Sequence, residues 1–339
     1  MKQLTVHENL FEGAVAFQHG DGWLQPVRLK VNEIPLHHEA FVERATTPGG
    51  SRLRFATTSD NLLLEVAATD DDTPRIFDLT TDNALLATVA LQPGSTEVKF
   101  DNLPPGRKTL ELWLPTHQPV KIRRLTIDDG EELSSSPDPR PRWVTYGSSI
   151  THCKTAHSPS RTWPAVAARR RGLNLTSLGY GGNCQMEPLV AMMIRDLPAA
   201  FISLKVGINM SRGTVAQRTY RTLLIGMVKI IREKHPTTPI AVISPIISPP
   251  REDTPGATGM TLRMMRDELE LAVNRLRECG DDNVHYFSGL ELFGEDLVAD
   301  YLPDLLHPNG DGYEIMGRNF ATQVIDKILP QAGGSKPAL

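Results

Sequence analysis

Residues 143–151 have the sequence WVTYGSSIT, a short apolar run that ends in a glycine and two serines. The apolar run predicts a buried β-strand, and the glycine and serines predict a turn after it. Just beyond, Thr162 and Pro164 are typical of a helix start, as N-cap and first-turn residue. In open α/β sheets, ligands bind at the carboxyl ends of the strands. Ser149 is therefore a candidate nucleophile, although a serine at such a turn is by itself more often a turn or cap residue.

From Arg142 onward, strand patterns alternate with helix patterns. Further strands are expected at 174–178, 200–206, 239–244 and 283–287. Helices are expected at 187–194, from about 215 to 234, at 262–276, and from 312 to about 329. Five strands that alternate with helices predict a parallel, doubly wound sheet, which is a three-layer, flavodoxin-like α/β domain.

The preceding part of the chain, from residue 13 to about 128, has a different pattern. Short alternating runs, each bounded by Gly, Pro, Asp or Asn, occur at 14–17, 23–29, 52–55, 62–66, 75–79, 85–89, 96–100, 109–114 and 120–125. Many short strands with regular turns predict an all-β sandwich of the jelly-roll kind or a barrel. Trp23 and Trp113 are expected in its core, in preference to a sugar-binding platform.

The length of 339 residues and the change of pattern along the chain predict two domains. We assign residues 1–128 to the β-sandwich and 142–330 to the catalytic α/β domain. Residues 129–141 are rich in Ser, Pro and acidic side chains and are predicted to be a linker, and 331–339 are predicted to be a C-terminal tail.

Charge and hydropathy exclude several classes of partner. The net charge is −4 and no basic stripe occurs, so nucleic acid is not expected. No apolar run approaches the roughly 18 residues that span a bilayer. The first residues lack a secretory leader pattern, and three cysteines do not suit a disulfide framework, so a cytoplasmic location is expected. The oligomeric state is not indicated.

The common cofactor and metal motifs do not occur. Residues 179–184, GYGGNC, resemble a dinucleotide fingerprint but have Cys184 in place of the third glycine. A phosphate-binding loop and a Gly-x-Ser-x-Gly elbow are both missing, and His152, Cys153 and Cys184 lack metal-ligand spacing. We therefore expect no cofactor and no metal.

Polar or glycine residues follow several of the predicted strands. Ser149 follows the first, Gly182 the second and Asn209 the third, and Asp304 and His307 precede the last helix. All should meet at one edge of the sheet. A hydroxyl, an imidazole, a carboxylate, backbone N–H groups and an amide are the groups needed to attack a carbonyl and stabilise the oxyanion.

These residues resemble the sequence blocks of the SGNH or GDSL hydrolases, over roughly 190 residues from 142 to 329. The first block is similar to residues 147–150, and Gly182, Asn209 and Asp304-x-x-His307 are similar to the other three. The resemblance implies that Ser149 is the nucleophile, His307 the general base and Asp304 the residue that orients it. It also implies an oxyanion hole made of the Ser149 and Gly182 N–H groups and the Asn209 amide.

Two positions depart from the family pattern, because Ser148 and Met210 stand where aspartates are usual. Neither is a triad position, so the implied chemistry is unchanged. We expect an esterase or deacylase that acts through an acyl-enzyme on a small or carbohydrate-like O-acyl substrate. An acyltransferase is the nearest alternative, and an inactive binding module is a third.

Two further expectations concern the surroundings of the site. Residues 244–259 leave the fourth strand at the catalytic edge and are rich in Pro and Gly, which favours a specificity loop over a tolerated insertion. Cys153 and Cys184 each follow a catalytic block closely. We expect them near one another beside the site, as thiols in preference to a disulfide.

Overall fold

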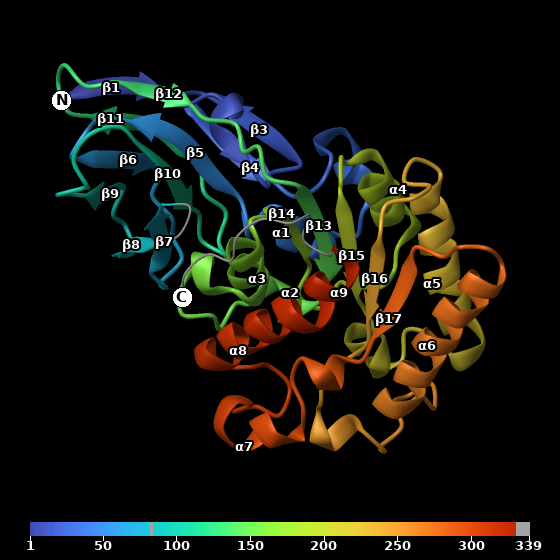
Figure 1. Ribbon diagram of the computed structural model, residues 1–339. Helices are drawn as coiled ribbons and strands as arrows, with labels where there is room; N and C mark the ends of the chain where they lie inside the picture. The colour runs from blue at the N-terminus through green and yellow to red at the C-terminus, as the bar shows by residue number, and fades with distance from the viewer. Residues whose placement is uncertain (82–83, 330–339) are drawn as a thin grey trace.

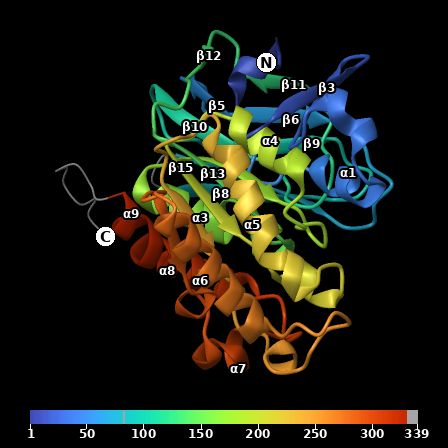
Figure 2. The same ribbon diagram turned by 90° about the vertical axis from the view of Figure 1, so that its right-hand side faces the viewer.

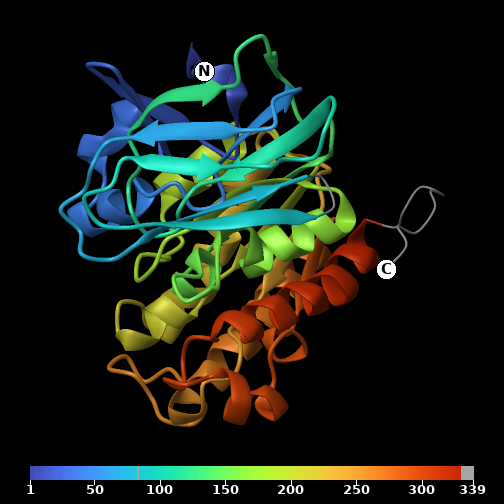
Figure 3. The ribbon, with the colours of Figure 1, turned by 90° about the vertical axis from the view of Figure 1, so that its left-hand side faces the viewer.

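The computed structural model describes residues 1–81 and 84–329. The first half of the chain forms two antiparallel sheets that share one apolar core (Figures 1 and 3). The first sheet has the order β3-β4-β11-β6-β9, with β1 also paired to β11. Its strands are β1 (Lys2–Thr5), β3 (Ala16–Gly20), β4 (Trp23–Val27), β6 (Leu62–Val66), β9 (Glu97–Phe100) and β11 (Ile122–Ile127).

The second sheet has the order β12-β5-β10-β7-β8, with β2 also paired to β5. Its strands are β2 (Phe11–Glu12), β5 (Arg52–Thr57), β7 (Arg75–Thr80), β8 (Leu85–Leu91), β10 (Lys108–Trp113) and β12 (Leu133–Ser135). The expected β-sandwich is confirmed. Strand β12 lies within the segment 129–141, where composition alone predicts a linker.

A helical segment that was not expected from the sequence lies between β4 and β5 of the sandwich. A 3-10 turn at Val31–Leu36 leads into helix α1 (Glu39–Ala45), which begins at an N-cap on His38. The segment is short and lacks a long apolar period, so periodicity does not reveal it. Its buried Phe41 packs on Tyr180 of the second domain, with ring centroids 4.5 Å apart.

The two tryptophans of the sandwich have different environments. Trp113 is buried and donates its indole N–H to Thr80 Oγ1, but it packs in the apolar cluster of the second domain and not in the core of the sandwich, where it was expected. Trp23 is only half-buried, and the Lys121 ammonium lies 4.6 Å from its ring centroid.

The second half of the chain forms the predicted five-stranded parallel sheet, in the order β14-β13-β15-β16-β17. The strands are β13 (Arg142–Gly147), β14 (Asn174–Gly179), β15 (Phe201–Lys205), β16 (Ile240–Ile243) and β17 (Val284–Phe287). This order is that of a flavodoxin-like sheet, so the fold class is confirmed. Residues buried on both faces of β15 and β16 show that helices cover the sheet on both sides.

The helices lie in two layers (Figures 1 and 2). Helices α3 (Trp163–Arg171) and α8 (Gly310–Phe320) cover one face, and α4 (Pro188–Asp196), α5 (Gln217–Arg232) and α6 (Leu262–Glu278) cover the other. Two short helices, α2 (Ser149–His152) and α7 (Val298–Tyr301), lie in loops. The expected closing helix at 312–329 is confirmed as one helical stretch from 310 to 328, in which a π-helical turn at Ala321–Ile325 lies between α8 and α9 (Asp326–Ile328).

An aromatic cluster fixes the first of these layers. Trp143 stacks on Phe320 at 5.1 Å and on Phe201 at 5.9 Å, and Trp163 lies 4.8 Å from Phe320. The cluster therefore joins β13 and its neighbour β15 to α3 and α8. None of the helices in the described ranges is both long and apolar enough to span a bilayer. The predicted tail, 331–339, and residue 330 lie outside the described residues.

The sandwich covers the free edge of β14, the outermost strand of the parallel sheet. Arg52 donates to Leu175 O at 3.0 Å, and Arg28 donates to Ser177 O at 3.3 Å and to Gly179 O at 2.7 Å. These three carbonyls alternate along the strand, so they face outward from the sheet in the hydrogen-bonding direction. The unpaired backbone groups of an uncovered edge strand can pair with a strand of another chain. Here arginine side chains bind the carbonyl groups of β14 and cover that edge.

Candidate active site

Ser149 is the first residue of α2 and is separated from the end of β13 only by Ser148. The Ser148 hydroxyl caps this helix by accepting from Ile150 N–H. The helix sits close against the strand ends, because a Cβ on Gly147 would lie 2.1 Å from Thr151 Oγ1 and a Cβ on Gly179 would lie 2.4 Å from His152 N. Glycines at the ends of β13 and β14 thus allow the short helix to bring Ser149 to the carboxyl edge.

Asp304 and His307 lie in the loop before α8. The Asp304 carboxylate accepts the backbone N–H groups of Leu306 at 3.0 Å and His307 at 2.6 Å, and accepts the His307 Nδ1–H at 2.7 Å. Leu305 has a positive φ of 58°, which tightens the loop. The aspartate therefore holds both the backbone and the ring of His307.

The structure brings Ser149 and His307 together across 158 residues of sequence. Ser149 Oγ donates to His307 Nε2 at 2.9 Å, while Nδ1–H of the same ring donates to Asp304. Partial burial acts to raise the pKa of Asp304, but its hydrogen bonds from His307 and Leu306 outweigh this and lower it. Asp304 thus stays ionised through the mildly acidic range, and together with His307 it can activate the Ser149 hydroxyl.

Gly182 lies in a β-turn that follows β14. Asn183 N–H donates to Tyr180 O at 3.0 Å, and Gly182 has a φ of +76° at the third position of the turn, where a positive φ requires glycine. Among the described residues, none accepts a hydrogen bond from Gly182 N–H. The turn lies next to the serine, because a Cβ on Gly181 would be 3.6 Å from Ser149 Cβ.

Asn209 follows β15 in a short 3-10 turn at Ile208–Arg212. Its side-chain Oδ1 accepts from Cys184 N–H at 3.1 Å. Because the oxygen is engaged in this bond, the amide nitrogen is the atom left to donate. The contact also ties the loop after β14 to the loop after β15, so the two predicted oxyanion donors are held as one unit.

Both nearby cysteines are buried, free thiols. Cys153 caps α2 at its C-terminal end and donates to Ile150 O, and Cys184 lies two residues after Gly182. Burial raises the pKa of both thiols well above the ordinary value. They are therefore protonated fillers and not nucleophiles.

The segment 244–259 splits into two parts. Residues 244–248 are buried, and Arg266 fixes them by donating to Pro245 O at 3.0 Å and Ile246 O at 3.2 Å. Ser248 Oγ donates to Leu305 O at 2.7 Å, which connects this segment to the His307 loop. Most of the remainder, from residue 249, is exposed.

Sequence reasoning missed His152, which lies one helical turn after Ser149. Its Nε2–H donates to Thr116 O at 2.5 Å and lies 3.2 Å from Thr47 Oγ1, so it contacts the sandwich from within the catalytic domain. Burial lowers the pKa of His152 well below that of a free imidazole, and the Arg28 guanidinium acts in the same direction. No spacing rule identifies such a residue, because its partners are backbone and hydroxyl oxygens of another domain.

The buried, neutral His152 predicts a loss of stability in acid. The unfolded chain takes up a proton at this position below about pH 6.5, and the folded chain does not, so stability is present above that pH and falls as the pH decreases. We expect the wild-type free energy of unfolding to fall by about 2 kcal/mol more between pH 7 and pH 5 than that of His152→Gln, measured by urea denaturation. Glutamine retains an N–H donor but does not titrate. Equal slopes for the two proteins would contradict this role.

The described part of the chain also contains one potential cation site. His157 and Asp311 lie 2.9 Å apart, and Glu314 completes a group whose ligand atoms are within 4.8 Å of one another. Arg161 and Arg318 both pair with Glu314. Because two guanidinium groups already compensate this carboxylate, the group suits an ion-pair network better than a metal.

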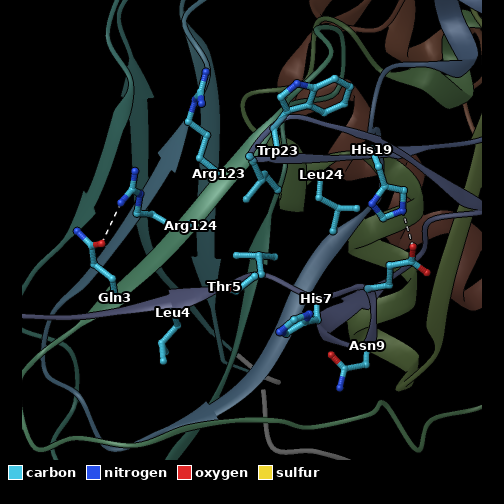
Figure 4. A pocket seen from close by; sticks show the side chains of 14 residues that line it. Gln3, Leu4, Thr5, His7, Asn9, His19, Trp23, Leu24, Arg123 and Arg124 are labelled. Carbon is cyan, nitrogen blue, oxygen red and sulfur yellow. Dashed lines mark hydrogen bonds and ion pairs between the residues drawn. The ribbon is translucent and has the colours of Figure 1, made fainter.

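A cavity of about 1040 Å³ is lined by residues of the sandwich, away from Ser149 (Figure 4). It lies between β1 and β4, which both pair with β11, and is lined by residues that include Thr5, His19, Trp23, Leu24 and Arg123. The Trp23 ring packs closely on Gly20, where a Cβ would be 2.1 Å away, and Lys121 lies over it. With these contacts the indole is a poor stacking platform, and we give this cavity no role in the chemistry.

Comparison with known proteins identifies the family. Residues 141–328, more than half of the chain, match the model of the GDSL-like lipase/acylhydrolase family. The chain belongs to this family. Residues 10–123 match the family model named "SsfX3, N-terminal domain". No curated protein sequence matches the chain significantly.

Solved structures similar to this GDSL-family chain include an acyltransferase and several carbohydrate esterases. The salicylyl-acyltransferase SsfX3 from a tetracycline biosynthetic pathway is 33% identical, with a TM-score of 0.89 over 97% of this chain and 98% of that one. A putative GDSL-like lipase from Bacteroides ovatus is 21% identical, with a TM-score of 0.78 over 97% and 98%. A family two carbohydrate esterase from Clostridium thermocellum is 14% identical, with a TM-score of 0.69 over 94% and 98%, and at this identity it supports the fold alone.

Proposed function

We propose that this enzyme is a serine-dependent ester hydrolase that acts through an acyl-enzyme on a small or carbohydrate-like O-acyl substrate. The observation that carries the proposal is the pair of contacts at His307, 2.9 Å from Nε2 to Ser149 Oγ and 2.7 Å from Nδ1 to Asp304 Oδ2. Ser149 attacks the ester carbonyl, and His307 takes the hydroxyl proton and returns it to the leaving alkoxide. Asp304 holds the imidazole in the tautomer that has its proton on Nδ1.

The oxyanion formed in this step is held by three donors, the N–H groups of Ser149 and Gly182 and the Asn209 amide. The contact from Cys184 N–H to Asn209 Oδ1 supports this assignment, because it engages the amide oxygen and leaves the amide N–H groups to donate. Donors fixed in advance in this way stabilise the charge that develops in the transition state.

The exposure of the triad favours water over an alcohol as the molecule that takes the acyl group from Ser149. The side chains of His307 and Asp304 are 31% and 54% exposed, so solvent reaches the base that would activate water for deacylation. No cofactor or metal takes part in this mechanism.

Acyl transfer to an alcohol is the second candidate. The 33% identity to the salicylyl-acyltransferase over almost the full length of both chains favours it. Both activities share the acyl-enzyme, so the triad residues do not discriminate between them.

The test supplies an acyl ester or thioester with and without candidate alcohols, sugars among them. Acid and new ester are followed by mass spectrometry, together with the acyl group on Ser149. We expect acid release at a similar rate with and without alcohol. If acid release is negligible until an alcohol is added, and ester then forms rapidly, the enzyme is a transferase.

We also propose the finer assignments of domain and location. The sandwich ends near residue 128 and the catalytic domain begins near residue 142, with 129–141 as a connection that carries β12. A cytoplasmic location is supported by the three unpaired cysteines, which suit a reducing compartment. The proposed partners are small-molecule or carbohydrate esters, and neither nucleic acid nor a membrane.

A further inference from the structure

Arg28 is a buried cation of the sandwich, and its hydrogen-bond acceptors among the described residues are all neutral oxygens. Its Nε donates to Thr47 O at 2.7 Å, and its Nη2 donates to Arg44 O at 2.5 Å and to Thr47 Oγ1 at 2.8 Å. Its Nη1 donates to Ser177 O and Gly179 O across the domain boundary. Burial lowers the pKa of this guanidinium to about 10, which leaves it charged at neutral pH.

The two carbonyls of the second domain that Arg28 contacts, Ser177 O and Gly179 O, lie at the end of β14. They come directly before the β-turn at 180–183, which contains Gly182. Gly179 immediately precedes Tyr180, the first residue of that turn. The Tyr180 hydroxyl donates to the backbone carbonyl of Arg28, and the Arg28 guanidinium lies 5.2 Å from the Tyr180 ring centroid. Arg28 thus contacts the start of the turn through both its side chain and its backbone.

The other end of the turn is held by the same part of the sandwich. Asn183 Nδ2 donates to Ala40 O at 3.1 Å, in helix α1. Phe41 of that helix packs on the Tyr180 ring, and Arg28 N–H donates to Ala45 O at the end of the helix. Arg28 therefore also anchors the helix that supports the far side of the turn.

From these contacts we propose that Arg28 is a positioning residue for the oxyanion hole. It fixes where Gly182 N–H points, although it contacts neither substrate nor nucleophile. The sandwich then contributes to the rate of the chemical step through one guanidinium group, apart from any contact it makes with substrate. This inference rests on the proposed acyl-enzyme chemistry, in which Gly182 N–H stabilises an oxyanion.

The alternative is that Arg28 only joins the two domains. Arg52 provides the matched control, because it is also a buried sandwich arginine that donates to an outward carbonyl of β14. Its partner, Leu175, lies four residues before Gly179, and none of the contacts of Arg52 reaches the turn. Arg28→Lys and Arg52→Lys keep the charge and lose the multiple donors of a guanidinium to similar degrees.

The experiment compares an ester with the matching thionoester, in which sulfur replaces the carbonyl oxygen. Sulfur accepts hydrogen bonds poorly, so the thionoester gains little from the oxyanion donors, and the ratio of the two kcat/KM values reports their alignment. We expect Arg28→Lys to lower kcat for the ester by about 10- to 100-fold with little change in KM, and to lower the ester-to-thionoester ratio. Arg52→Lys should keep the wild-type ratio, because a loss of folded enzyme lowers both rates equally.

A variant of Tyr180 provides an independent check that leaves the buried guanidinium group in place. Tyr180→Phe deletes only the hydroxyl that donates to Arg28 O, and should lower the same ratio by a smaller factor than Arg28→Lys. A wild-type ratio in Arg28→Lys, or an equal change in Arg52→Lys, would overturn the proposal.

Hydrogen exchange separates this proposal from the proposed function itself. The amides of Tyr180, Asn183 and Cys184 are hydrogen-bonded and should be protected in the wild type. In Arg28→Lys they should exchange at least tenfold faster, while the amides of β16 should not, and Arg52→Lys should leave the turn unchanged. Unchanged exchange in the turn would contradict the positioning role even if no ester proved to be a substrate. An inactive wild type with faster exchange in Arg28→Lys would contradict only the proposed reaction.

Discussion

Ser149→Ala should lower kcat for ester cleavage by about 10⁴-fold or more, because the acyl-enzyme has no other residue on which to form. Removing the serine of such a triad costs nearly as much as removing all three members, since they act as a unit. The remaining activity reflects the oxyanion donors and substrate binding alone. The measurement is turnover of an acyl ester, together with labelling by a fluorophosphonate probe, which should be lost.

The matched control for this variant is Ser148→Ala. Ser148 is adjacent, and its hydroxyl only caps α2 through Ile150 N–H, so its loss should cost about 1 kcal/mol of stability and leave labelling intact. Labelling that persists in Ser149→Ala, or disappears in Ser148→Ala, would place the nucleophile elsewhere.

The residues of the proposed triad could be found from the sequence because each follows a recognisable element. Ser149 comes after the apolar run of β13, and Asp304 and His307 are separated by a spacing that puts them on one tight loop. Parallel strands bring their carboxyl ends to one edge, so order along the chain was enough to expect these groups together. Gly182 and Asn209 followed from the same argument for β14 and β15.

The contacts between the domains could not be found in this way. Arg28 and His152 bind carbonyl and hydroxyl oxygens, and every residue supplies a carbonyl, so no residue type marks the partner. Helix α1 has only seven residues, too short for a clear helical period, and it is stabilised by packing on Tyr180. Both features depend on how the two domains meet, which local patterns do not encode.

The segment at 129–141 shows the same limit. Its Ser, Pro and acidic residues resemble a flexible connection, yet Asp138 is buried and Arg140 is only 15% exposed. Both join a charged cluster with Glu111 and Arg52, which lie on neighbouring strands of the second sheet. The composition of a segment indicates that it is hydrophilic. It does not indicate which of its charged side chains pair with opposite charges elsewhere in the chain and become buried.

Arg52→Met should therefore lower the free energy of unfolding by about 3–5 kcal/mol, the typical cost of removing one partner of a buried ion pair. Arg52 is 1% exposed, with its Nε 3.3 Å from Glu111 Oε1 and its Nη2 3.2 Å from Asp138 Oδ2. Methionine fills much of the same volume, so the loss reflects the missing donors to Leu175 O and Asn174 Oδ1 and the weaker compensation of the two buried carboxylates, which still pair with Arg140, more than a cavity. The measurement is urea denaturation at neutral pH.

The control for this change is Arg124→Met on the first sheet. Arg124 pairs with Glu65 at 2.9 Å, but its side chain is 43% exposed, so water replaces the partner and the change should cost no more than about 1 kcal/mol. Because Arg52 also donates to Asn174 Oδ1 and Leu175 O, its replacement should loosen the contact between the domains before either core melts. Two separate unfolding transitions should then replace a single one. Equal small losses in both variants would mean that the buried cluster adds little beyond an exposed ion pair, and that the apolar contacts around Phe41 and Tyr180 hold the domains together.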